Sequence, residues 1–466
     1  MAPHFADRLS ALDASFLDIE TTGSHMEIGA VATFELGPLR TEDGGVDFAR
    51  IARFVESSLP RVPRYRQRIL RAPIVDQPYW VDDHQFRLNY HLRHTALPRP
   101  GDERQLHRLA GRIFGHCLDP ARPLWELWVV EGLRDDRFAL IFKAHHALAD
   151  GIAGAGILTE ILTGTERDPE PWTPRPPPPP HELLQAEVTH RAAGVPRLVS
   201  ALRDAAAHPL DQASTLRDAA TGALETLRVG LSQARPSPLN PPHIGPHRRF
   251  DACRLDLEAM KAVKRSLGGT INDVVLTVAT GAIARYLERL GEPLDDPRDF
   301  RALVPVNTRQ DTGIAGNRVA LMFVPLPLAL RDPIARHTEI CRRTAHAKHE
   351  GGHATASELF EDVANWTATT LVTALMKVAT FRRAFNVVIT NVPGPPFAMH
   401  LLGARLLAVH PRVPLYENQA LGLALFSYDG GMYWGLNTDW SSGAHPHLLV
   451  QDIQTTFAEL HTAATQ

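Results

Sequence analysis

The chain has 466 residues, a formal net charge of −3, and 44% hydrophobic and 22% charged residues. This composition is ordinary for a soluble globular protein of two or three domains, and the balanced charge argues against nucleic acid as a partner. The three cysteines, Cys117, Cys253 and Cys341, are far apart and form no Cys-x-x-Cys motif, which is typical of reduced thiols in a cytoplasm and not of a disulfide framework.

The sequence shows neither the pattern of a signal peptide nor that of a membrane-spanning segment. The first residues, 1–8, have no basic region followed by an apolar core, so we expect no signal peptide. No run of about 18 apolar residues occurs, so we expect no membrane span. The sequence therefore predicts a cytoplasmic protein that meets any lipid substrate from the water side.

The first part of the chain alternates predicted strands with predicted helices. Apolar, β-prone segments predict strands over 28–36, 123–131 and 137–144, and helical periodicity predicts helices over 48–59 and 105–114. A turn between 123–131 and 137–144 makes these two strands a hairpin.

Five arginines crowd the segment 61–71. They have the charge to meet the phosphates of a nucleotide-containing substrate or an anionic lipid surface. The alternative is a solvated turn and strand edge, because runs of charge usually face water.

The sequence His145-His146-Ala147-Leu148-Ala149-Asp150-Gly151 follows the strand over 137–144 and precedes a helical pattern. Loops at strand ends are where rigid scaffolds place chemistry. Because adjacent residues of an extended segment face opposite ways, His145 and His146 are expected to do different jobs. Asp150 has the spacing to turn back to His146 or to hold the loop that carries it, and Gly151 removes a side chain where the backbone must bend or a ligand must pass close. The alternative is a pair of core histidines beside a helix cap, whereas a metal site lacks a third ligand nearby.

A proline-rich and helical segment, 166–246, separates the two α/β parts. Five consecutive prolines, 176–180, predict a semi-rigid spacer without a core of its own. The following residues, 181–235, have helical periodicity and few aromatics. We place the domain boundary in this crossover.

The second α/β part begins at about 247. Strands are predicted over 249–255, 303–306, 318–326 and 385–390, and a hairpin over 421–436. Helices are predicted to 267, from 271 to about 290, and over 333–349 and 356–380. Thr270 and Asp273 form a capping box at the start of the long helix.

Several motifs together resemble one protein family. His-His-x-x-x-Asp-Gly is similar to the signature of the CoA-dependent acyltransferase superfamily, which includes chloramphenicol acetyltransferase and condensation domains. Other stretches narrow the resemblance to the bacterial wax ester synthase/diacylglycerol acyltransferase family; these are Leu9–Leu17, Pro123-Leu124-Trp125, Asn272-Asp273, Pro305-Val306-Asn307 and Asn391-Val392-Pro393-Gly394-Pro395. The resemblance covers nearly the whole chain.

The resemblance implies an α/β protein of the α+β type. We expect two chloramphenicol-acetyltransferase-like domains, each with a mixed sheet flanked by helices, over 1–165 and 247–466, joined by the crossover 166–246. Because only the first part carries the heptapeptide, one site for two halves implies that the site lies between them. By resemblance to condensation domains, Arg66 or Arg68 is expected to pair with Asp150.

The chemistry of acyl transfer to an alcohol assigns the catalytic residues. A neutral histidine near its ordinary pKa of about 6.5 suits the general base. We assign this role to His146, because it alone has the spacing to Asp150 found in the superfamily that the motif resembles. His145 is expected to be its structural neighbour, and Asp150 the residue that holds the loop. Asn272, at a helix start, is expected to donate to the oxyanion, although helix capping alone also explains it.

The expected substrate-binding residues are Gly151, Trp125, Asp273 and Asn391. Trp125 fits a core aromatic as well as a substrate wall, and Asn391 shapes an acyl tunnel or only fixes its turn. The family usually has Ser before this Asn, and Thr390 here keeps the hydroxyl. No metal ligand is expected.

The sequence therefore predicts an O-acyltransferase that moves a long-chain acyl group from acyl-CoA, its co-substrate, to diacylglycerol or a long-chain alcohol. No Gly-x-Ser-x-Gly motif supports an acyl-enzyme, so direct transfer is the simpler interpretation. No cofactor is expected, and contact with a membrane or lipid droplet surface is expected to be peripheral. The alternatives are a condensation-type enzyme that takes carrier-bound acyl groups and a decayed relative that only binds lipid. The sequence does not decide the oligomeric state.

Overall fold

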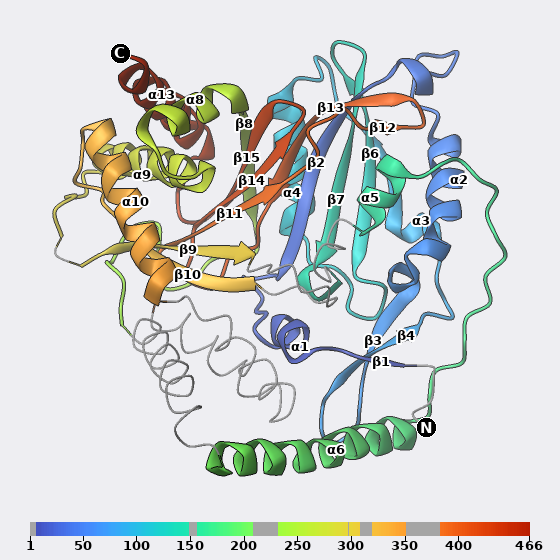
Figure 1. Ribbon diagram of the computed structural model, residues 1–466. Helices are drawn as coiled ribbons and strands as arrows, with labels where there is room; N and C mark the ends of the chain where they lie inside the picture. Colours follow the sequence, from blue (N-terminus) through green and yellow to red (C-terminus); the bar gives the residue numbers. More distant parts are fainter. Residues whose placement is uncertain (1–5, 149–155, 208–231, 297, 308–318, 351–382) are drawn as a thin grey trace.

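The computed structural model describes residues 6–148, 156–207, 232–296, 298–307, 319–350 and 383–466. Two six-stranded sheets lie beside each other, each with helices packed on it (Figure 1). Parallel and antiparallel pairs occur in both sheets. The expected fold, two mixed sheets flanked by helices, is therefore confirmed.

The N-terminal sheet has the strand order β12-β13-β2-β7-β6-β5. Its strands are β2 (Glu27–Glu35), β5 (Leu92–Ala96), β6 (Trp125–Leu133), β7 (Arg137–His145), β12 (His400–Leu401) and β13 (Ala404–Arg412). The predicted strand over 28–36 and the predicted hairpin over 123–144 are confirmed, since β2 and β6 both pair antiparallel with β7. Strand β7 is central in the sheet, which explains why its side chains are nearly all buried.

Helices cover both faces of this sheet. The elements are α1 (Ala11–Asp18), α2 (Phe48–Ser58), α3 (Leu88–His91), α4 (Glu103–Gly115), α5 (Gly156–Thr163), and the 3-10 helices η1 (Gly37–Leu39), η2 (Leu59–Arg61), η3 (Pro63–Arg66) and η4 (His146–Leu148). The helices predicted over 48–59 and 105–114 are confirmed as α2 and α4. A small three-stranded sheet, β1-β4-β3, lies nearby and comprises β1 (Asp7–Arg8), β3 (Gln67–Arg71) and β4 (Pro78–Asp82).

The C-terminal sheet has the strand order β10-β9-β11-β14-β15-β8. Its elements are β8 (Arg248–Asp256), α8 (Leu257–Leu267), α9 (Ile271–Arg289), β9 (Phe300–Asn307), β10 (Val319–Leu326), α10 (Pro333–Glu350), β11 (Val387–Pro393), β14 (Leu421–Tyr428), β15 (Gly431–Asp439) and α13 (Pro446–Thr465). These confirm the predicted strands, the hairpin over 421–436 and the helices over 271–290 and 333–349. The helix predicted over 356–380 lies outside the described residues.

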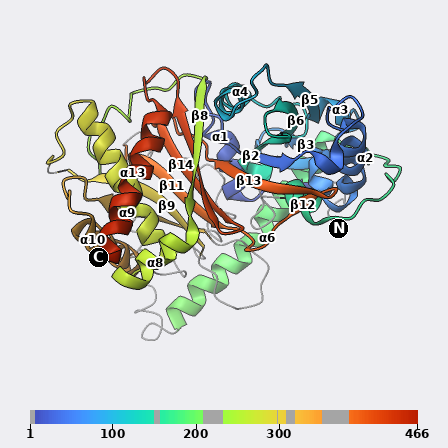
Figure 2. The same cartoon turned by 90° about the horizontal axis from the view of Figure 1, so that it is seen from above.

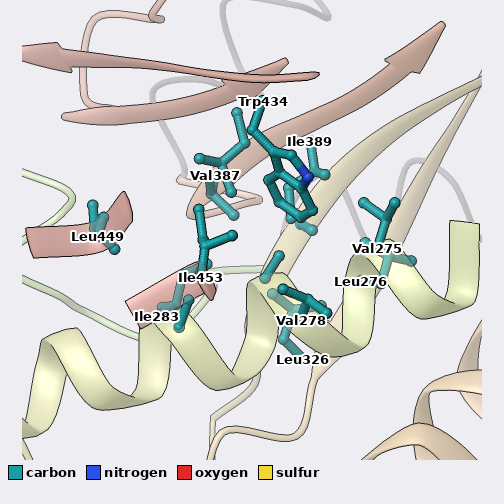
Figure 3. Packing of buried hydrophobic residues seen from close by; sticks show 14 of the residues in the cluster. Val275, Leu276, Val278, Ile283, Leu326, Val387, Ile389, Trp434, Leu449 and Ile453 are labelled. Atoms are coloured by element: carbon teal, nitrogen blue, oxygen red, sulfur yellow. The ribbon is translucent and has the colours of Figure 1, made fainter. Parts of the chain in front are cut away.

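Helix α9 lies at the centre of the C-terminal core. Its apolar residues point to the sheet and to α13, and the indole of Trp434 on β15 lies among them (Figure 3). A helix that is apolar on nearly all sides is stable only when other elements surround it. The packing therefore fixes the N-terminus of α9, which carries Asn272.

A strand from the C-terminal part of the chain joins the N-terminal sheet and links the two halves. Strand β13, from the C-terminal part of the chain, pairs antiparallel with β2 and so completes the N-terminal sheet (Figures 1 and 2). A Cβ atom at Gly435 on β15 would lie 1.7 Å from the carbonyl oxygen of Pro411 on β13, so only glycine permits this approach. The predicted domain boundaries at 165/166 and 246/247 stay a prediction. Strand β13 belongs by sequence to the predicted C-terminal domain but pairs within the N-terminal sheet.

The proline-rich spacer contacts the N-terminal half. Arg175 forms an ion pair of 2.8 Å with Asp82, and the Trp172 indole lies under the guanidinium of Arg66, 5.0 Å from its carbon. The helical segment after it begins as α6 (Pro180–Ala207), in agreement with the predicted helical character of 181–235, of which 208–231 lie outside the described residues. The spacer has no regular structure but is held against the first half.

Candidate active site

The two histidines lie where β7 ends and η4 begins. The backbone N–H of His145 donates to Leu124 (2.9 Å), and the backbone N–H of His146 donates to Met26 (2.7 Å). Both bonds continue the pairing of β7 with its neighbours past the end of the regular strand. The position of this pair is therefore set by the sheet itself, as the sequence predicted for a loop at a strand end.

The side chain of His145 is buried, with 2% of the residue exposed. Its Nδ1 accepts a hydrogen bond of 3.0 Å from the Ala147 backbone N–H, and its Nε2 lies 3.2 Å from Oε1 of Glu20. One ring nitrogen is thus hydrogen-bonded within the protein, and the other lies close to a carboxylate oxygen. This geometry fits the structural role that the sequence analysis assigned to His145.

The side chain of His146 faces different surroundings. Its ring stacks on Phe16 of α1, with centroids 4.0 Å apart, and its buried Nδ1 has no hydrogen-bond partner among the described residues. Burial, with the neighbouring His145, lowers the pKa of His146 to about 4. The expectation of an ordinary pKa near 6.5 is therefore wrong, because the sequence could not show the apolar cover of Phe16.

Buried charges lie next to His145 on the same face of the sheet. Glu27 is the cross-strand partner of His145, and its Oε2 lies 3.8 Å from Nζ of Lys143 and 3.9 Å from Nη1 of Arg412. All three side chains are at most 1% exposed. Because Arg412 ends β13, these charges join the C-terminal part of the chain to the strand ends that carry the histidines. Breaking such a pair is strongly destabilising.

Asn272 and Asn391 come together in the C-terminal half. Asn272 is the second residue of α9, Asn391 lies near the end of β11, and Nδ2 of Asn391 donates to Oδ1 of Asn272 at 2.7 Å. This bond occupies the oxygen of Asn272 and leaves its Nδ2 to donate elsewhere. The positive end of the helix dipole adds to the suitability of this group for a developing negative charge. The contact between two motifs 119 residues apart was not predicted.

Asp273 has a clear structural task. Its Oδ2 accepts from the backbone N–H (2.7 Å) and the hydroxyl (2.8 Å) of Thr270, and its Oδ1 accepts from the Thr344 hydroxyl at 2.6 Å. The capping box predicted from Thr270 and Asp273 is confirmed. All these bonds hold Asp273 in place, so its expected contact with substrate has no support in this geometry and stays a prediction.

Trp125 lies in the N-terminal core. It is fully buried, its Nε1 donates to the Tyr65 carbonyl at 2.8 Å, and its ring stacks on His91 at 4.9 Å. Of the two alternatives, the structure favours a core aromatic over a substrate wall.

Asp150 and Gly151 lie outside the described residues, so their expected roles stay predictions. Arg66, one expected partner of Asp150, is buried over Trp172, and its Nε has no hydrogen-bond partner within the residues that the structure describes. Three other arginines of the run are paired with carboxylates: Arg61 with Glu160, Arg64 with Asp7, and Arg71 with Asp18 and Asp76. These pairs favour the structural alternative for the arginine run over a site for phosphates.

The sequence analysis missed Phe16, Glu20 and Met26. Phe16 lies on α1, which packs against η4, and Glu20 and Met26 lie in the segment between α1 and β2. Phe16 is part of a quoted family motif, so a signal was present without a role attached to it. Glu20 and Met26 lie outside that motif, and only the pairing of β2 with β7 brings them to the histidines.

Comparisons with known proteins identify the family of this chain. Residues 9–275 match the family model of the wax ester synthase/diacylglycerol acyltransferase catalytic domain, and residues 315–461 match the model of the C-terminal domain of that family. The chain belongs to this family. The acyltransferase class expected from the sequence is thereby confirmed.

Other members of this family match the chain over most of their length. A probable diacylglycerol O-acyltransferase of Mycobacterium tuberculosis is 33% identical over 97% of this chain and 96% of its own. An O-acyltransferase of Acinetobacter baylyi is 28% identical over 90% of this chain and 89% of its own. A solved wax ester synthase/diacylglycerol acyltransferase from Marinobacter aquaeolei has a TM-score of 0.69 and 25% identity, covering 98% of this chain and 100% of its own.

A starter condensation domain of rhizomide synthetase has the same fold, with a TM-score of 0.57 and 12% identity, covering 99% of this chain and 95% of its own. Within the described residues no single helix is long and apolar enough to cross a membrane; α8 and α9 meet that test only as a pair bent by 100°. In the same part of the chain, no group of three or more His, Cys, Asp or Glu side chains is arranged to hold a metal ion.

Proposed function

We propose that this family member transfers a long-chain acyl group from acyl-CoA directly to the hydroxyl of diacylglycerol, with His146 as the general base. The observation that carries the proposal is the state of the His146 ring. It is neutral at pH 7, because its pKa is lowered to about 4, and no group in the described part of the chain hydrogen-bonds to its Nδ1. A neutral imidazole without a competing partner is able to accept the proton of a substrate hydroxyl.

The reaction then balances as follows. The hydroxyl oxygen forms a bond to the thioester carbon while its proton moves to His146. The carbon–sulfur bond breaks, and the proton passes from His146 to the CoA sulfur. Asn272 donates from Nδ2 to the oxyanion that forms on the carbonyl oxygen, since its Oδ1 already accepts from Asn391.

Four other residues support this step. Phe16 covers one face of the His146 ring and lowers its contact with water, which also protects the thioester from hydrolysis. Asn391 orients Asn272. Asp150, outside the described residues, retains its proposed task of holding the loop of His146, and Gly151 that of leaving room for the substrate.

We further propose that acyl-CoA is the co-substrate and that no metal or redox cofactor is required, because the thioester is already an activated acyl donor. Diacylglycerol is placed first as acceptor because several relatives are named for it. The Marinobacter structure is named for wax ester synthesis as well, so a long-chain alcohol is the second candidate acceptor. The enzyme is expected in the cytoplasm, meeting these lipids by peripheral contact with a membrane or lipid droplet.

The test supplies purified protein with radiolabelled oleoyl-CoA and, in separate arms, dioleoylglycerol or hexadecanol in detergent micelles. We expect labelled triacylglycerol, labelled wax ester, or both, with one CoA thiol released for each ester formed. His146→Ala serves as the control for non-enzymatic transfer.

Three results would contradict the proposal. Transfer only from a carrier-protein-bound acyl group would favour the condensation-type alternative. Binding of oleoyl-CoA without any ester would favour the decayed lipid-binding alternative. CoA release without ester would mean that water is the acceptor.

A further inference from the structure

Glu20 lies between α1 and β2, beside the histidine pair but outside every motif that the sequence analysis used. Its Oε1 accepts a hydrogen bond of 2.7 Å from the Met26 backbone N–H and lies 3.2 Å from Nε2 of His145. The carboxylate side chain is 25% exposed, whereas the His145 side chain is 3% exposed. One oxygen therefore joins the α1–β2 segment to the end of β7.

The contacts of His145 fix its tautomer. Nδ1 accepts from the Ala147 N–H, so in the neutral ring the proton must be on Nε2, where it points to Glu20. A proton on Nδ1 would face another N–H and break the hydrogen bond that shapes η4. An anionic acceptor at Nε2 selects the tautomer that keeps this bond, in the way that a carboxylate orients a metal-bound histidine.

The same carboxylate also reaches His146 through the backbone. Glu20 accepts from the N–H of Met26, and the carbonyl of Met26 accepts from the N–H of His146 at 2.7 Å. Glu20 thus holds His145 by its ring and His146 by its main chain. Movement of Glu20 would release both contacts together.

The charge of Glu20 is consistent with this task. Burial alone would raise the pKa of this carboxyl, but hydrogen bonding and attraction to His145, together with the Met26 N–H, hold the pKa below its ordinary value. Glu20 is therefore an anion at pH 7, which accepts from the Met26 N–H and lies beside the Nε2–H of His145.

We propose that Glu20 is a positioning residue for acyl transfer: it fixes the Nε2–H tautomer of His145 and, through Met26, the place of the general base His146. This inference rests on the proposed function of His146. It predicts that the acceptor oxygen of residue 20 matters more than its charge, because this one oxygen accepts from the Met26 N–H and lies 3.2 Å from the protonated Nε2 of His145.

The experiment compares Glu20→Gln with Glu20→Met in the full-length protein. Gln keeps an oxygen that accepts from both groups, and Met has a similar length without a strong acceptor. We expect Glu20→Met to lower kcat about 10- to 100-fold, the usual effect of losing the partner that orients a functional histidine, with little change in KM for oleoyl-CoA. Glu20→Gln should retain turnover within about 10-fold.

Chemical rescue separates positioning from general loss of structure. In Glu20→Ala the shortened side chain leaves room at a partly exposed position, and formate should restore a measurable part of kcat by accepting from His145. The matched control is Asp18→Ala. Asp18 lies two residues away, is 26% exposed and pairs with Arg71 at 2.9 Å, so its loss removes a carboxylate of similar exposure from the same region. It should keep its turnover and gain nothing from formate.

Folded Glu20→Met with wild-type kcat would overturn the inference. So would a loss of activity in Glu20→Ala that follows its melting curve and is not relieved by formate. If the wild-type protein itself formed no ester, the proposed function would fail first, and the two failures are therefore distinguishable.

Discussion

The phenyl ring of Phe16 stacks on the imidazole of His146, with ring centroids 4.0 Å apart and ring planes 28° apart. Phe16 belongs to α1, near the start of the chain, so a segment 130 positions before the histidine forms one wall of its pocket. Because an apolar wall disfavours the charged imidazolium, this contact accounts for part of the lowered pKa of His146.

Replacing Phe16 should therefore change the pH profile of the enzyme. In Phe16→Ala water reaches the ring, and the acid limb of kcat/KM should move from about pH 4 toward the ordinary histidine value of about 6.5. Phe16→Leu keeps an apolar cover and should stay close to the wild-type profile. The measurement is initial acyl transfer per mole of folded protein, with melting curves, since truncating a buried Phe costs about 3–5 kcal/mol. If the acid limb did not move in folded Phe16→Ala, Phe16 would not be a cause of the lowered pKa of His146.

The lowered pKa of His146 also predicts how stability depends on pH. The unfolded chain has an ordinary histidine and binds more protons than the folded chain between about pH 4 and 6.5, so stability is full above this window and falls as the pH falls through it. His410, which burial holds at a pKa of about 3, acts in the same direction. His146→Ala should flatten, without abolishing, the decrease in melting temperature from pH 7 to 4.5. An unchanged slope would mean that His146 titrates normally in the folded protein.

The pair Asn272–Asn391 allows a test of oxyanion stabilisation against helix capping. Asn272→Ala should lower kcat about 10²–10³-fold, as expected for a lost oxyanion donor. Asn391→Ala should lower it less, and the double variant should be no worse than Asn272→Ala, because Asn391 acts through Asn272.

The cap-only control for this pair is Thr270→Ala. It removes the side-chain cap of α9 and should cost about 1 kcal/mol of stability with kcat retained. If Asn272→Ala behaved like Thr270→Ala, with a lower melting temperature and a normal rate, Asn272 would be a cap and nothing more.

The local patterns of the sequence predicted most elements but not their long-range partners. Alternation and helical periodicity placed β2, β7, α4 and α9 to within a few residues, because each buries its own apolar face. Strand β13 was not expected, because its place in the N-terminal sheet depends on pairing with β2, 372 to 383 positions away. For the same reason Glu20 and Phe16 escaped notice, and the pKa of His146 could not be read from its motif.

Because β13 forms part of the N-terminal sheet, we predict that neither half catalyses acyl transfer alone. Fragments 1–165 and 240–466, expressed separately, should give no acyl transfer, because the first lacks β13 beside β2 and the second lacks the histidines. Cleavage of the intact protein within 171–181 should instead leave an associated and active complex, since both sides of the cut stay anchored. Size-exclusion chromatography and the ester assay check both cases. Turnover by fragment 1–165 would refute a site shared by the two halves.

The most direct measurement compares His146→Ala with His145→Ala by initial acyl transfer per mole of folded protein, with melting curves for each. His146→Ala should lose about 10²–10⁴ in rate, about 3–5 kcal/mol of transition-state stabilisation, with its fold intact. His145→Ala leaves Glu20 and the Ala147 N–H without their partner and should lose about 1–3 kcal/mol of stability, with a smaller loss in rate. The opposite result, a His145→Ala enzyme as inactive as His146→Ala with an unchanged melting curve, would contradict the assignment of His146 as the base and His145 as its support.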